Sequence, residues 1–186
     1  MAASSPTSQI VFDMDRFKEL VVFIADLCVD DPTFGAVKLN KILYFADFMA
    51  YRVLGKSMTG ATYFRLPEGP APRQLLAARD ELLVERRVEI EQRPYFNGVQ
   101  KRIVVIGEGP NSEEFSTAEQ DIVRSVAQFF EGKTDREVSD FSHLQPGWIL
   151  ANDREDIPYE TAWLSSDPID QFDEEVARQM VDQYSQ

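Results

Sequence analysis

The sequence predicts an α+β fold that is mainly helical, with one antiparallel β-hairpin. Apolar residues recur at helical spacing through residues 34–54 and nearly encircle the helix, which is typical of a central, buried element. Farther along, Asn97-Gly98 separates two runs rich in β-branched residues. This dipeptide favours a hairpin because both central residues of the preferred turn need positive φ. We therefore expect a helical core and a hairpin from about Val88 to Ile106.

Two helices are expected before the first proline-rich stretch. Asp13 or Asp15 can cap a first helix, whose apolar stripe ends near Asp30-Asp31-Pro32. The connection to the next helix is short, so the two helices should be neighbours in space. The second, central helix runs from about Phe34 to Leu54, and Gly55 fits a left-handed cap.

Further elements follow from caps and turn residues. Pro70 and Pro72 suit the opening of a third helix, expected from about Ala71 to Arg87. The hairpin strands are expected at about 88–93 and 100–106. Two capping boxes, at 116–119 and 134–137, predict two more helices. Residues 152–166 show no regular pattern.

The length of 186 residues fits one domain. We expect a flexible leader at 1–12, a domain at 13–165 and an acidic C-terminal helix or tail at 166–186. No apolar run approaches 18 residues, and the first residues lack the basic start and apolar stretch of a signal peptide. The sequence therefore predicts a cytoplasmic protein with no membrane span.

The negative charge is confined to one part of the chain. The formal net charge is -13, yet residues 1–110 hold 14 acidic and 14 basic side chains, whereas residues 111–186 hold 18 acidic and 5 basic. Such a field favours cationic partners and opposes sequence-independent binding of phosphate backbones.

Signatures of catalysis and of metal or cofactor binding are missing. The sequence has no HExxH, no cysteine pairs for zinc, no GxGxxG after a strand, no P-loop and no GxSxG. The single cysteine, Cys28, falls on the apolar stripe of the first helix, where a small buried hydrophobe is expected rather than a nucleophile paired with His143. We predict no cofactor, no metal and no enzymatic activity; an enzyme that uses His143 as a general base is the less favoured alternative.

A DNA-binding role is a second alternative. Two helices, an extended link, a third helix and a hairpin could form a winged-helix-like unit. Its last helix and hairpin carry seven basic residues, Arg73, Arg79, Arg86, Arg87, Arg93, Lys101 and Arg102. Acidic residues are interleaved with them, so the footprint for phosphates is weak and nucleic acid is not the expected partner.

Two stretches resemble a known family. KLNKILYFADFMAYRVLGKSMTG, followed by an extended TYFRLPEGPAP, resembles the Panacea domain of SocA-like antitoxins and of some phage-associated proteins. SDFSHLQPGW, from Ser139 to Trp148, is similar to the Ser/His/Trp segment near the end of that domain. The resemblance spans about Phe17 to Leu164. Valine is common in the family where this chain has Ala71.

The resemblance implies an antitoxin that neutralises a cognate toxin, encoded by an adjacent gene, through direct protein contact. The SocA member resembles an adaptor that delivers its toxin to a protease, which is a further possibility for this chain. From the motifs and from interface chemistry we predict eleven toxin-binding residues, Lys41, Tyr44, Phe48, Tyr51, Tyr63, Arg65, Pro67, Gly69, Pro70, His143 and Trp148. For the positions on the central helix, a buried core role is the alternative.

Overall fold

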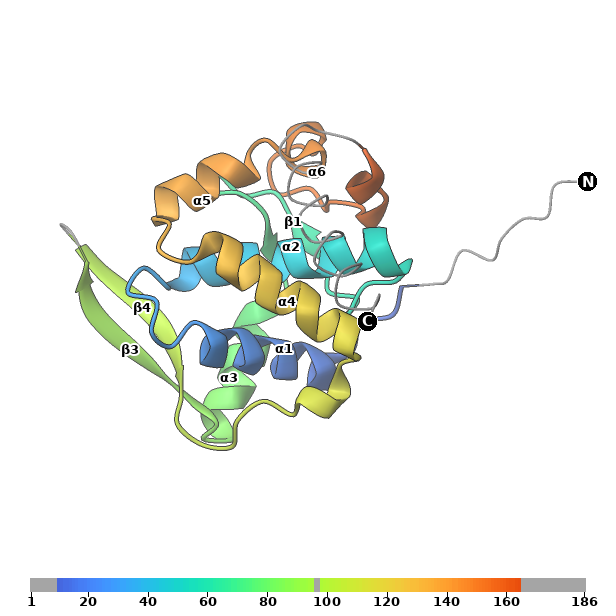
Figure 1. Cartoon of the computed structure of the whole chain (residues 1–186). Helices are drawn as coiled ribbons and strands as arrows, with labels where there is room; N and C mark the ends of the chain where they lie inside the picture. Colours follow the sequence, from blue (N-terminus) through green and yellow to red (C-terminus); the bar gives the residue numbers. More distant parts are fainter. Residues whose placement is uncertain (1–9, 96–97, 165–186) are drawn as a thin grey trace, which may run out of the picture.

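Helix α2 (Ala36–Leu54) runs through the middle of the molecule, as the sequence predicts (Figure 1). The computed structural model describes residues 10–95 and 98–164. Around α2 lie three helices that contact it, α1 (Met14–Leu27), α4 (Thr117–Phe130) and α5 (Asp135–Ser142). Because α2 is covered on several sides, most of its residues are buried, including Lys38, Lys41 and Asp47.

Local signals fix the helix ends. The Asp13 carboxylate accepts a hydrogen bond from the Arg16 N–H (3.0 Å), so Asp13 is the cap of α1. Gly55 ends α2 at φ 75°, a left-handed conformation that suits glycine. Both predicted capping boxes are formed, at the starts of α4 and α5. These four predictions are confirmed.

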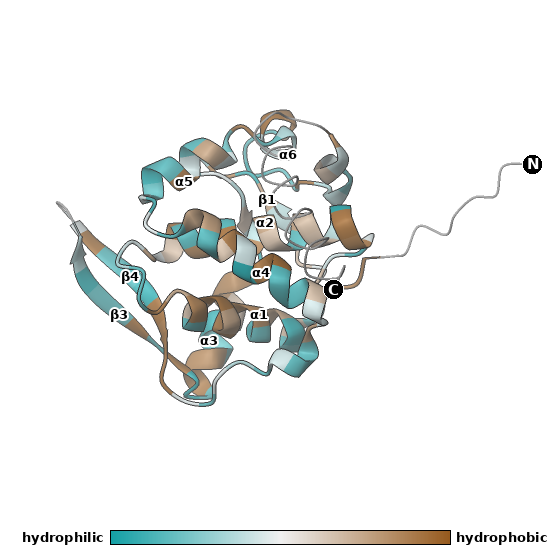
Figure 2. Ribbon diagram, in the orientation of Figure 1, coloured by the Kyte–Doolittle hydropathy of each residue, from teal (hydrophilic) through white to brown (hydrophobic). Residues whose placement is uncertain are grey.

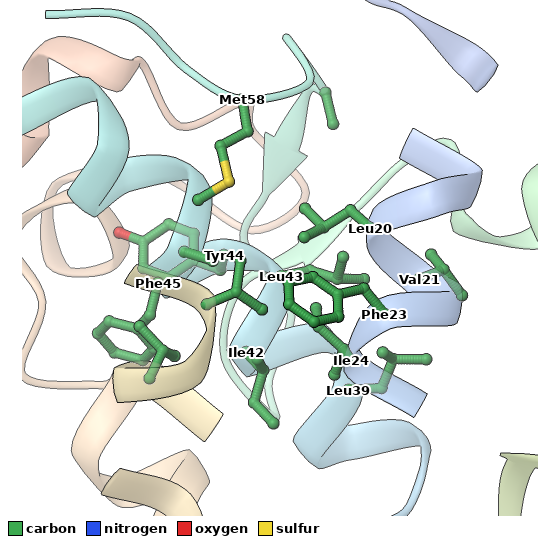
Figure 3. Packing of buried hydrophobic residues seen from close by; sticks show 14 of the residues in the cluster. Leu20, Val21, Phe23, Ile24, Leu39, Ile42, Leu43, Tyr44, Phe45 and Met58 are labelled. Carbon is green, nitrogen blue, oxygen red and sulfur yellow. The ribbon is translucent and has the colours of Figure 1, made fainter. Parts of the chain in front are cut away.

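The core forms where α1 and α2 face each other. Figure 3 shows Leu20, Ile24, Leu39 and Leu43 pointing into the same space from the two helices. Figure 2 shows apolar residues along this contact, whereas much of α5 and β3 is hydrophilic. Phe17 is fully buried and lies edge-on to Phe12, a residue of the predicted leader. Residues 1–9 of that leader and the predicted C-terminal helix or tail lie outside the described residues.

The predicted hairpin is confirmed. Strands β3 (Val88–Tyr95) and β4 (Gly98–Val105) are antiparallel, with Ile90 opposite Ile103; the turn residues 96–97 lie outside the description. The hairpin lies along one side of the helices and projects beyond them (Figure 1). Arg102 ties it to α1, because its guanidinium donates to the carbonyls of Cys28 (3.1 Å) and Val29 (2.8 Å) at the end of that helix.

The prediction of a third helix from Ala71 was wrong at its start. Helix α3 spans Leu75–Val84, and Ala71–Pro72 instead form strand β2, paired antiparallel with β1 (Tyr63–Phe64). The Arg73 N–H donates to the Thr62 carbonyl (2.9 Å), and this long-range bond holds the segment extended. The fold therefore has a second two-stranded sheet that the sequence did not predict.

Short elements complete the described chain. They are the 3₁₀-helix η1 (Ser112–Glu114), helix α6 (Pro146–Leu150) and the 3₁₀-helix η2 (Tyr159–Trp163). The segment expected to be irregular also contributes an antiparallel bridge, in which Asp156 pairs with Phe64 on the free edge of β1.

Candidate functional site

The aromatic strip of α2 is part of the core. Tyr44, Phe48 and Tyr51 are only 3%, 5% and 7% exposed. The Phe48 ring stacks on Tyr159 of η2 with centroids 4.6 Å apart, and the Tyr51 ring lies 4.9 Å from the Trp163 ring. The segment at η2 thus covers Phe48 and Tyr51. The sequence alone left both a buried role and a binding role open for these positions.

Asp47, in the middle of α2, holds the chain that returns from the helix. Its carboxylate accepts hydrogen bonds from the N–H groups of Met58 (2.8 Å) and Thr59 (3.0 Å), from Thr59 Oγ1 (2.6 Å) and from the Tyr63 hydroxyl (2.8 Å). Burial raises the pKa of Asp47, and these hydrogen bonds oppose the rise. Four donors around one buried carboxyl group fix the position at which β1 begins.

Lys41 holds the proline-rich loop. Its Nζ donates to the Pro70 carbonyl at 3.1 Å, and the side chain is almost completely buried. Burial lowers the pKa of Lys41 to about 8, an effect that nearby acidic side chains oppose. Gly69 passes directly over this side chain at φ 99°, and a Cβ there would lie 2.6 Å from Lys41 Cε and 2.1 Å from Ser142 Oγ. Only glycine fits this position without displacing its neighbours.

Arg65, Trp148 and His143 form a stack beside this loop. Arg65 Cζ lies 4.0 Å from the centroid of the Trp148 ring, and the His143 ring stacks on the same indole with centroids 4.1 Å apart. Trp148 Nε1–H donates to the Leu66 carbonyl (2.9 Å), 82 positions away in sequence. Arg65 in turn donates to the Ala151 carbonyl (2.6 Å). The stack therefore joins the segment from Ser139 to Trp148 to the proline-rich loop that follows β1.

The structure brings the eleven predicted toxin-binding residues together, mostly beneath the surface. Pro67 is exposed, and Arg65, His143 and Trp148 are half-buried. Seven are buried, namely Lys41, Tyr44, Phe48, Tyr51, Tyr63, Gly69 and Pro70. Buried side chains set the positions of their exposed neighbours rather than contact a partner directly. Toxin binding by these residues stays a prediction.

The described residues offer little catalytic chemistry. Burial raises the pKa of the Cys28 thiol to about 12, so the thiolate that a nucleophile requires is not formed at neutral pH. The His143 ring packs on Trp148, and its Nε2 is buried without a hydrogen-bond partner in the described part of the chain. In residues 10–95 and 98–164, no group of three or more histidine, cysteine or acidic side chains is arranged to hold a metal ion.

A groove beside β2 was not predicted from the sequence. It has a volume of about 310 Å³ and lies between α3, the β1–β2 sheet, the β3–β4 hairpin and the start of α2. Ten of its fifteen lining residues are apolar, four are basic and none is acidic. We call it the basic groove. Its residues come from positions 36 to 103, so only the tertiary structure brings them together.

Comparison with known families identifies the chain. Residues 39–149 match the family described as antitoxin SocA-like, Panacea domain. The chain belongs to this family. The Panacea match begins in α2 and ends in α6, so it includes all eleven predicted toxin-binding residues and every lining residue of the basic groove except Ala36. The matched range is shorter than the range of the resemblance in the sequence, which runs from Phe17 to Leu164.

No curated protein and no solved structure matches the chain. Within the described residues, each helix is too short or too polar to cross a membrane.

Proposed function

We propose that this protein is the antitoxin of a toxin-antitoxin module and neutralises its cognate toxin by direct protein-protein binding. The observation that carries the proposal is the Panacea match over residues 39–149, because the family is one of antitoxins. The toxin is encoded by an adjacent gene, and both proteins act in the cytoplasm. Neutralisation is stoichiometric and requires no catalysis.

The packing around the family motifs supports this proposal. Lys41 and Trp148 hold the loop between β1 and β2 through hydrogen bonds to the carbonyls of Pro70 and Leu66, and Asp47 holds the segment that leads into β1 through Thr59. A surface held in this way loses little conformational entropy when a partner binds. The exposed residues at the loop, Pro67 and Glu68, are therefore presented in one defined conformation.

DNA binding receives less support, because several basic residues of the suggested footprint are engaged within the domain. Arg87 pairs with Glu19 of α1, with Nη2 and Oε2 3.0 Å apart, and Arg93 pairs with Glu91 at 2.9 Å. Arg102 is buried and donates to carbonyls at the end of α1. These guanidinium groups are directed to internal partners rather than to a shared phosphate-binding surface.

Co-expression tests the proposal. Each gene adjacent to the one for this protein is expressed in a bacterial host, alone and together with the antitoxin, and the complex is then purified from the doubly expressing cells. We expect one neighbour to be toxic alone, harmless in the pair and recovered near one to one. If neither neighbour is toxic, or if toxicity persists with both proteins present at high level, the proposal is wrong.

Neutralisation can follow from binding alone or from delivery of the toxin to a protease. Toxin abundance separates these modes once the pair is known. A toxin that is only held stays at constant abundance after synthesis is stopped, whereas a delivered toxin disappears faster with the antitoxin than without it. Repeating the chase in hosts that lack individual ATP-dependent proteases identifies the protease in the second case.

A further inference from the structure

We infer that the basic groove is the site at which the antitoxin takes hold of its partner, and that the occupant is an amphipathic toxin segment with an apolar face and acidic flanks. This inference rests on the proposed function and deepens it. The occupant is specified by the two properties of the groove, its apolar lining and its one-sided charge.

The apolar lining provides the area for docking. Leu76 on α3 lines the groove and is 64% exposed, and Ile90 on β3, which also lines it, is only partly buried. Covering such a leucine side chain stabilises a complex, because apolar surface is removed from water. An apolar concavity between a helix and a hairpin suits a helical or extended segment that inserts alternate side chains.

The charge of the groove is opposite to that of the protein. The chain holds 32 acidic and 19 basic residues, yet every charged residue that lines the groove is basic. Arg102 is committed to carbonyls of the α1 terminus, and Arg73 pairs with Asp156 at the rim. Lys101 is exposed and has no ion pair within the described residues. In the part of the chain that the structure describes, Arg79 pairs only with the adjacent, exposed Asp80.

These cations select an acidic occupant. A solvent-exposed ion pair such as that of Arg79 with Asp80 contributes little to stability, so the guanidinium can turn to a new carboxylate at small cost. Elsewhere the acidic surface repels an acidic segment, which directs that segment to this groove. A nucleic acid fits less well, because ten of the fifteen lining residues are apolar and offer phosphates nothing.

Paired variants test the inference with the full chain and the toxin that the wild type neutralises. Leu76→Asp, in the groove, is compared with Leu150→Asp on α6, whose leucine is equally exposed at 66%. The double variant Arg79→Glu with Lys101→Glu is compared with Arg136→Glu on α5, whose side chain is 91% exposed. The five substitutions in these four variants are at exposed or, for Arg79, partly exposed positions, and circular dichroism and urea unfolding verify that each variant remains folded.

We expect Leu76→Asp to weaken the affinity for the toxin at least about 30-fold, the loss typical of a central interface residue. The double charge reversal should weaken it at least about tenfold and reduce its dependence on salt. Both control variants should stay within about threefold of the wild type. A photo-crosslinking residue at position 76, but not at position 150, should capture a toxin peptide that contains apolar and acidic residues.

Other results overturn the inference in distinguishable ways. If the wild type neutralises the toxin and both groove variants bind it as tightly, the groove is wrong and the proposed function stands. If Leu76→Asp weakens binding but the charge reversal does not, the acidic chemistry of the occupant is wrong. If the wild type shifts upstream DNA and only the charge reversal abolishes that shift, the protein occupant is wrong. If the wild type neutralises no neighbour, the proposed function fails and the inference fails with it.

Discussion

The family motifs and the basic groove adjoin and share five lining residues, yet they differ in physical character. In the motif region, comprising α2 and residues 57–70, charged groups are buried and bonded to fixed partners, as in Asp47 with Thr59 and Lys41 with Pro70. In the groove, Lys101 and Leu76 are exposed, and neither is held by the fold. Our proposal assigns a different role to each region: the buried motif residues shape the domain, and the groove binds the toxin.

The largest expected effect is that of Asp47→Ala. The variant leaves several buried donors without an acceptor, and each unsatisfied buried donor costs about 1–3 kcal/mol, so we expect the free energy of unfolding to fall by at least about 3 kcal/mol. Urea unfolding measures this. Asp47→Asn, which retains one oxygen acceptor, should be milder, and Asp140→Ala, at a side chain 68% exposed, should change stability by less than about 0.5 kcal/mol. Equal effects at positions 47 and 140 would contradict the structural role of Asp47.

Lys41 should make stability depend on pH. Its pKa in the folded protein is lowered to about 8, below the value of the unfolded chain. Below pH 8 both states carry the proton and the contribution does not change. Between pH 8 and about 10.5 the unfolded chain binds more protons, so unfolding becomes less favourable as pH rises, by up to roughly 3 kcal/mol.

Comparison with Lys41→Met isolates this dependence. Relative to the variant, the wild type should gain stability from pH 8 to about 10.5, as measured by urea unfolding at several pH values. Lys56→Met, at an exposed lysine, reports the general effect of removing one positive charge. The prediction is wrong if the difference in the free energy of unfolding between the wild type and Lys41→Met stays constant from pH 8 to about 10.5. In that case burial would not lower the pKa of Lys41.

Three glycine variants separate backbone strain from steric conflict. Gly69→Ala introduces both, because φ is 99° and a Cβ would clash with Ser142 and Lys41, so we expect a loss of about 2 kcal/mol or more. Gly55→Ala introduces only the left-handed strain and should cost about 1 kcal/mol. Gly109 has neither a positive φ nor a neighbour within 4 Å, and its alanine variant should be neutral. Thermal unfolding ranks them, and any other order contradicts this account of the loop.

A smaller effect than those of Asp47→Ala and Gly69→Ala is expected at the stack of Arg65 on Trp148. Arg65→Ala removes a partly buried cation–π contact and a hydrogen bond to Ala151, which together should cost about 1–2 kcal/mol. Arg65→Lys keeps the charge without the planar guanidinium and should recover only part of the loss. Arg136→Ala serves as the exposed control. If Arg65→Ala is as stable as the wild type, the stack does not contribute to holding the loop.

These variants also sharpen the contrast between the two regions. Changes at the buried motif residues Asp47, Lys41 and Gly69 should weaken neutralisation only as far as they lower stability. Groove variants should weaken toxin binding at nearly unchanged stability. Folding and binding measured side by side on both sets therefore test whether the two roles are as separate as we propose.

Local sequence determined the parts of the fold that local physics controls. The Asp13 cap, the left-handed Gly55 and both capping boxes follow from side chains within a few residues of the groups they satisfy. The hairpin follows from alternation and an Asn-Gly turn signal. The sequence motifs alone also indicated the family that the comparison shows.

Only the tertiary structure decided what depends on distant partners. The extended conformation of Ala71–Pro72 is imposed by pairing with β1, although the prolines alone suit a helix start. The aromatic strip of α2 is buried because η2, about 110 positions along from it, lies over Phe48. The basic groove exists because α2, α3, β2 and the hairpin converge. Burial and concavity are properties of such long-range contacts, and the spacing of residues along one helix or strand cannot specify them.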